Sequence, residues 1–111
     1  MRIVEFLLYT LKKDSGAEFH RIMQEVSIPL HRAAGMDVVA YGQSIHDSDS
    51  YHLIRAYDSL IHLAESQESF YQSSDWRHGP REEIISRIEI SVKSVVHLSD
   101  EAINGLRSTS V

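Results

Sequence analysis

The chain has 111 residues, of which 42% are hydrophobic and 24% charged, as is typical of a single soluble globular domain. Eleven Lys and Arg against sixteen Asp and Glu give a net charge of −5, and the basic residues are scattered, which argues against a nucleic-acid partner. The lack of cysteine excludes disulfides and thiolate chemistry. With no apolar run of about 20 residues and no signal-peptide pattern, we expect a cytoplasmic protein without a membrane span.

The N-terminal third of the chain predicts a strand followed by a long helix. Residues 2–12 are apolar on both alternating faces, which favours a strand that is covered on both sides. Apolar residues then recur at helical spacing until Gly35, a candidate C-cap, and Pro29 predicts an interruption of the final turns. The apolar positions of this helix are Phe19, Ile22, Met23, Val26, Leu30 and Ala33.

The middle of the chain predicts a β-hairpin and a second helix. Residues 36–45 and 51–57 alternate as strands on either side of the polar turn HDSDS. Asp58 or Ser59 is then a suitable N-cap for a helix. The residues of this helix expected to face the core are Leu60, Leu63, Ala64 and Tyr71.

The C-terminal third predicts short helical segments and a last strand. After the sequence SSD, Trp76 begins a helical stretch that Pro80 can restart, and this single tryptophan is predicted to be a core residue. Residues 88–98 alternate as a half-buried strand. Residues 99–111 are expected to form a short helical turn and a tail.

The order strand, helix, strand, strand, helix, strand predicts an α+β, ferredoxin-like βαββαβ domain over residues 1–98, with residues 99–111 as a tail. Its four-stranded antiparallel sheet carries both helices on one face. Since the first strand is apolar on the other face too, a homodimer in which two sheets close around a shared interior is expected to cover it.

Several segments in order resemble the corresponding parts of the NIPSNAP family. They are IVEFLLYTLKK followed by Gly16, then IPLHRAAG, LIRAYDSL and SSDW, and the resemblance runs from about residue 2 to residue 98. It implies a dimeric α+β barrel, the architecture shared with small antibiotic-biosynthesis-type monooxygenases. It implies no established reaction.

The strand patterns also predict a ligand pocket. With Val4, Phe6 and Leu8 expected against the helices, the alternate residues face the interior of the barrel. A largely apolar cavity with a few convergent polar groups is the usual composition of a small-ligand site. The candidate pocket residues are Glu5, Tyr9, Tyr41, Gln43, Arg55 and Tyr57.

Arg55 has two interpretations. Together with the tyrosine hydroxyls it can bind a carboxylate or an enolate-like oxygen of a ligand. Alternatively, Arg55 pairs with Glu5 and the tyrosines pack at a dimer interface.

The other residue patterns predict neither a metal site nor a cofactor. His20 and His31 are too far apart along one helix to share an ion. The turn that joins His46 to His52 lacks the glycine and the terminal glutamate of a calcium loop. Neither a Gly-rich phosphate loop nor a GxSxG motif is present.

Three functional hypotheses remain, and none assigns a catalytic residue. The first is a dimeric protein that binds a small, partly apolar molecule in its barrel. The second is a cofactor-independent monooxygenase-like enzyme, whose pocket would desolvate a substrate anion beside Arg55. The third is a structural or assembly module with a filled barrel.

Overall fold

The computed structural model describes residues 1–107 and contains one four-stranded antiparallel sheet in the order β2-β3-β1-β4. This confirms the predicted α+β, ferredoxin-like fold. None of the helices in the described residues has the length and apolar character needed to cross a bilayer. The strands are β1 (Arg2–Leu11), β2 (Asp37–Gln43), β3 (Ser50–Tyr57) and β4 (Ile88–Leu98). The helices are α1 (Gly16–Ile22), the π-helix η1 (Met23–Ser27), α2 (Ile28–Ala33), α3 (Leu60–Gln72), α4 (Ser74–Arg77), α5 (Arg81–Ile85) and α6 (Asp100–Leu106).

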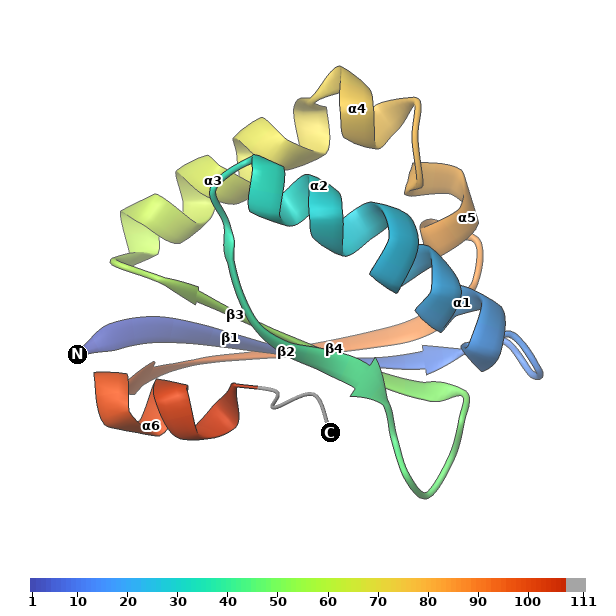
Figure 1. Cartoon of the computed structure of the whole chain (residues 1–111), viewed down its shortest axis with the longest axis horizontal. Helices are drawn as coiled ribbons and strands as arrows, with labels where there is room; N and C mark the ends of the chain where they lie inside the picture. The colour runs from blue at the N-terminus through green and yellow to red at the C-terminus, as the bar shows by residue number, and fades with distance from the viewer. Residues whose placement is uncertain (108–111) are drawn as a thin grey trace.

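Helices lie on both sides of the sheet: α1 to α5 cover one face, and α6 lies against the other (Figure 1). Within the segment 99–111, α6 buries Ile103 to 1% exposure against side chains of β1, β2 and β3. Just after the helix, Arg107 donates hydrogen bonds of 2.8 and 3.0 Å to the two carboxylate oxygens of Asp37. Residues 108–111, the end of the expected tail, lie outside the described residues.

The π-helix η1 shifts the inward face of the first helix by one residue. The predicted face contained Val26 and Leu30: Val26 is 38% exposed and Leu30 is only partly buried against the core, while Ser27 and His31 are buried. A π-helical turn accommodates one more residue than an α-helical turn, so each later position is rotated around the helix axis. Pro29 falls in the first turn of α2, where its missing N–H is tolerated.

Serine side chains begin the helices after the hairpin. The Ser59 side chain accepts a hydrogen bond of 3.0 Å from the backbone N–H of His62 and caps α3, as predicted. Ser73 caps α4 by accepting from the N–H of Trp76 at 3.2 Å, and Pro80 precedes α5. The serine caps therefore fix where α3 and α4 start, whereas α5 has no side-chain cap.

Only part of α3 faces the core as predicted. Leu63 and Tyr71 pack against the buried cluster, whereas Leu60 is 63% exposed and Ala64 is also exposed. The prediction for Leu60 and Ala64 is therefore wrong. Both lie in the N-terminal half of α3, where the chain leaves β3 at the edge of the helical layer (Figure 1).

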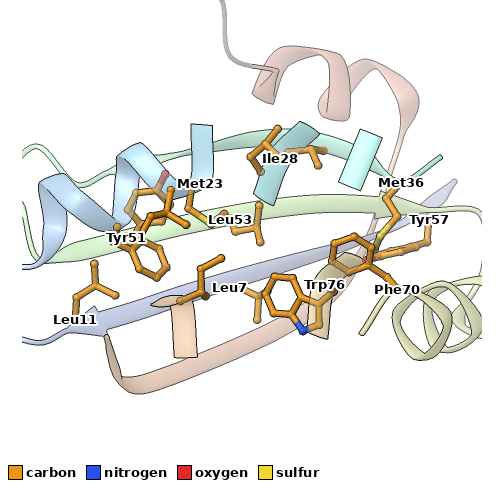
Figure 2. Packing of buried hydrophobic residues seen from close by; sticks show 14 of the residues in the cluster. Leu7, Leu11, Met23, Ile28, Met36, Tyr51, Leu53, Tyr57, Phe70 and Trp76 are labelled. Carbon is orange, nitrogen blue, oxygen red and sulfur yellow. The ribbon is translucent and has the colours of Figure 1, made fainter. Parts of the chain in front are cut away.

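Trp76 is a core residue, as predicted, with 5% of its surface exposed. Its ring centroid lies 5.5 Å from that of Phe70. Figure 2 shows both rings in the cluster between the sheet and the helices, together with Leu7 of β1. This aromatic contact joins α3 to α4 above the sheet.

The predicted assignment of the two sheet faces is wrong. Ile3, Leu7 and Leu11 belong to the core beneath the helices, whereas Val4 and Phe6 belong to a separate small cluster under α6. Because residues 3–9 of β1 are apolar on both alternating faces apart from Glu5, hydrophobicity alone could not distinguish them. The polar residues that we expected in the barrel interior therefore lie on the helix-covered face of the same protomer.

The face opposite the helices is only partly covered by α6. Leu8 and Val92 are paired across β1 and β4 and are 56% and 55% exposed, and Ile90 on the same side is 56% exposed. Exposed contiguous apolar surface of this kind is characteristic of an interaction site.

Candidate functional site

A fully buried ion pair lies at the centre of the helix-covered face. Glu5 and Arg55 are directly opposite each other in β1 and β3. Arg55 Nε and Nη2 lie 2.8 and 2.7 Å from Glu5 Oε1, and the two residues are 1% and 0% exposed. Charged groups this deeply buried are stable only when they are paired and hydrogen bonded.

Two residues from the helices complete the hydrogen bonding of Arg55. Its Nη1 lies 3.0 Å from His31 Nε2 and donates to the Tyr71 hydroxyl at 2.7 Å. His31 Nδ1 lies 2.7 Å from the carbonyl oxygen of Ser27, which can only accept, so Nδ1 carries the hydrogen and Nε2 accepts from Arg55. Burial, together with the nearby guanidinium, lowers the pKa of His31 to about 4, so the imidazole is neutral at pH 7.

The remaining carboxylate oxygen of Glu5 is also satisfied. Gln67 of α3 donates a hydrogen bond of 2.6 Å to Glu5 Oε2, and Lys93 Nζ of β4 lies 3.2 Å from the same oxygen. Gln67 also donates to the Tyr57 hydroxyl at 3.2 Å, and burial raises the pKa of Tyr57 to about 12. The buried network thus connects three strands with α2 and α3.

Arg55 pairs with Glu5, as in the second interpretation, but the dimer interface of that interpretation is not part of this arrangement. Its guanidinium donors contact Glu5, His31 and Tyr71, so a ligand carboxylate could reach Arg55 only by displacing one of these partners. Tyr57 packs inside one protomer, against the helices. A dimer interface is not needed to bury it.

Two of the predicted pocket residues lie apart from this network. Tyr41 is near the edge of the sheet, with its ring centroid 6.1 Å from that of His20. Gln43 donates a hydrogen bond of 3.0 Å to the Ser48 carbonyl in the hairpin turn. All six predicted residues therefore lie on the helix-covered face, where Glu5, Tyr9, Arg55 and Tyr57 are grouped and these two lie farther along the sheet.

An apolar recess of about 450 Å³ opens beside the network. Tyr9 forms its floor on the sheet, and burial raises the pKa of the Tyr9 phenol. No hydrogen bond of the Tyr9 hydroxyl occurs within residues 1–107, so this group is available to a molecule in the recess. The lining residues are Tyr9, Tyr71, Trp76, Arg81, Ile84, Ile85, Ile88 and Ser91.

A second recess, of about 580 Å³, shares Tyr71 and Arg81 with the first. Its other lining residues are Gln72, Arg77 and His78. Each of these lining side chains carries a polar or cationic group, and no acidic residue of the described chain lines this recess. The two recesses together form the candidate site.

Sequence reasoning missed His31, Gln67 and the basic residues of the second recess. His31 was hidden by the register shift at η1, and Gln67 lies on a helix whose apolar stripe is weak. Among residues 1–107, no three His, Asp or Glu side chains are grouped in a way that could hold a metal ion.

Comparisons with known proteins support the fold. The chain matches no protein-family model and no curated protein. It is similar to the crystal structure of a NIPSNAP family protein from Agrobacterium tumefaciens, with a TM-score of 0.80, 18% identity, and coverage of 89% of this chain and 87% of that one. A NIPSNAP-like domain protein from Burkholderia xenovorans gives a TM-score of 0.80 at 16% identity, covering 89% and 86% of the two chains.

A provisionally assigned antibiotic biosynthesis monooxygenase from Nitrosomonas europaea is also similar, with a TM-score of 0.65 and 14% identity over 86% of this chain and 96% of that one. At these identities the likeness concerns the fold. The chain therefore has the ferredoxin-like α+β fold of NIPSNAP proteins, as its sequence motifs predicted.

Proposed function

We propose that this NIPSNAP-like protein is a cytoplasmic homodimer that binds a small, partly apolar molecule. In this proposal the molecule occupies the recess beneath Tyr71 and Trp76, with Tyr9 as its floor. The cytoplasmic location rests on the sequence composition alone.

The observation that carries the proposal is the Tyr9 hydroxyl. Tyr9 lines the apolar recess and its hydroxyl makes no hydrogen bond within the described residues, next to a network in which the other polar groups are paired. A small number of polar groups within apolar walls is typical of small-ligand sites. The buried network would hold Tyr71 in place, because Arg55 donates to its hydroxyl.

The homodimer is supported by the sheet face opposite the helices. Leu8, Ile90 and Val92 form an exposed apolar surface there, and a second copy would bury it through a symmetric contact. The ligand recess lies on the other face, so dimer formation in this manner leaves the recess within each protomer.

Native mass spectrometry of the protein purified from cells tests both parts. A dimer that carries an additional mass, which is lost on denaturation, supports the proposal and starts to identify the molecule. The Tyr9→Phe and Trp76→Leu variants should retain less of it, whereas Tyr41→Phe, outside the recess, serves as the control. A dimer that never retains or binds any small molecule would favour an assembly module with a filled interior.

A cofactor-independent monooxygenase is a second candidate. It is favoured by the fold shared with a provisionally assigned antibiotic biosynthesis monooxygenase and by a phenol beside an apolar recess. Oxygen consumption with quinols or other enolate-forming substrates is the test. Turnover that falls in Tyr9→Phe, with the fold intact, would support an enzyme, and its absence would leave the binding role.

A further inference from the structure

The two recesses differ sharply in chemistry although they adjoin. The first is lined by aromatic and aliphatic side chains that include Trp76 and Ile84, and the second by Gln72, Arg77 and His78. Tyr71 and Arg81 line both. One molecule could therefore place an apolar part in the first recess and a polar part in the second.

The charge of the second recess is positive in a chain whose net charge is −5. Arg77 forms no ion pair within residues 1–107. Arg81 Nη1 lies 2.9 Å from Glu82 Oε1, an exposed pair that leaves other guanidinium donors free. Two guanidinium groups and one carboxylate leave an excess of one positive charge, which matches a single negative charge on a ligand.

We propose that the site binds an amphipathic carboxylate, with its apolar body against Tyr9 and Trp76 and its carboxylate between Arg77 and Arg81. This inference rests on the proposed binding function and names the ligand class. Guanidinium groups suit it because their planar donors form paired hydrogen bonds with a carboxylate. The recess volume of about 450 Å³ is sufficient for one ring and a short chain.

Trp76 provides an internal reporter, because it is the only tryptophan and lines the apolar recess. Its fluorescence can be titrated with 4-phenylbutanoate and with the uncharged 4-phenylbutanamide, which have the same apolar body. We expect both to bind and the carboxylate to bind about tenfold more tightly, the usual effect of a hydrogen bond to a charged group. Added salt should weaken the binding of the carboxylate and leave the binding of the amide unchanged.

Arginine variants assign the carboxylate to its site. Arg77→Gln and Arg81→Gln should each reduce the preference for the carboxylate over the amide, with little change in amide affinity. Arg32→Gln removes an exposed arginine from α2, which lines neither recess, and is the charge-matched control. A melting curve for each variant confirms that the fold is retained.

The outcomes separate the two proposals. Equal binding of acid and amide in all variants would overturn the carboxylate inference and leave the apolar binding site intact. Tighter binding of 4-phenylbutyl phosphate than of the carboxylate would also overturn it, because the site would then prefer a dianion. The absence of a saturable fluorescence change with both compounds would overturn the carboxylate inference. The binding function itself would be excluded only if, in addition, native mass spectra showed no retained molecule.

Discussion

Glu5 and Arg55 face each other across β1 and β3 with 2.7 Å between Oε1 and Nη2, and both are fully buried. Burial makes each charge dependent on the other. Removing Arg55 leaves the buried Glu5 carboxylate with only the half-exposed Lys93 as a counterion, whereas removing both partners leaves neither buried charge.

We predict that Arg55→Met destabilises the protein by about 3–5 kcal/mol, because the Glu5 carboxylate loses its buried counterion and keeps only the half-exposed Lys93. The double variant Glu5→Met/Arg55→Met should be more stable than the single one. Urea denaturation followed by circular dichroism measures both. Arg21→Met, which breaks two exposed ion pairs with Glu18 and Glu25, is the control and should change stability little. A small loss in Arg55→Met would mean that Lys93 or water compensates the Glu5 carboxylate.

The pH dependence of the free energy of unfolding should depend on the protonation of His31. Burial lowers its pKa from 6.5 to about 4 in the folded protein, so the unfolded chain binds a proton that the folded one excludes. The stability that neutral His31 contributes is complete above about pH 6.5 and is lost as the pH falls towards 4. The difference corresponds to about 3 kcal/mol at most.

His31→Gln tests this assignment, since an amide oxygen can still accept from Arg55 without titrating. The free energy of unfolding, measured by denaturation at several pH values from 7 to about 4, should fall less steeply in the variant than in the parent chain. His46→Gln, on the exposed hairpin turn, is the matched control. Identical slopes in the parent chain and in His31→Gln would show that the imidazole titrates freely in the folded state.

The sequence predicted the elements better than their orientation. Segment order and strand patterns were sufficient for the ferredoxin-like fold, and Ser59 marked the start of α3. The sequence prediction reversed the two faces of β1, because both faces are largely apolar. The informative signal was Glu5 itself: a carboxylate in a covered strand requires a cation, and Arg55 on β3 and Lys93 on β4 supply it.

The candidate site was harder to predict because it depends on helix register. The π-helix η1 places Ser27 and His31 inward in place of Val26, and no simple 3.6-residue pattern anticipates an inserted residue. The aromatic part was more accessible, since Trp76 was recognised as a core residue. Its second role, as a wall of the recess, depends on how α4 and α5 pack over the sheet.

Two tyrosines of the recess should respond differently to loss of their hydroxyls. Tyr71→Phe removes an acceptor of Arg55 and should cost about 1–2 kcal/mol of stability. Tyr9→Phe should change stability by less than about 0.5 kcal/mol, because its hydroxyl has no partner in residues 1–107. Thermal denaturation measures the difference. A large loss in Tyr9→Phe would indicate an ordered hydrogen bond at this hydroxyl.

Helix α6 is predicted to contribute to the stability of the domain. Ile103→Ala should cost about 2–5 kcal/mol, because Ile103 is buried against the sheet. Leu106→Ala, on the same helix and 36% exposed, is the control. Denaturation of a chain ending at residue 98 extends the test to the domain boundary. If this shortened chain is as stable as the full one, the helix lies outside the cooperative unit.

The homodimer prediction can be tested at the β1–β4 pair. Leu8→Lys places a charge on the exposed apolar face beside Val92, and in a symmetric contact the charge enters the interface twice. Light scattering after size-exclusion chromatography should then show a monomer at concentrations where the parent chain is a dimer, with an unchanged circular dichroism spectrum. Ile45→Lys on the exposed hairpin turn is the control and should remain dimeric. A Leu8→Lys protein that is still dimeric would place the interface elsewhere, and the apolar face would need another partner.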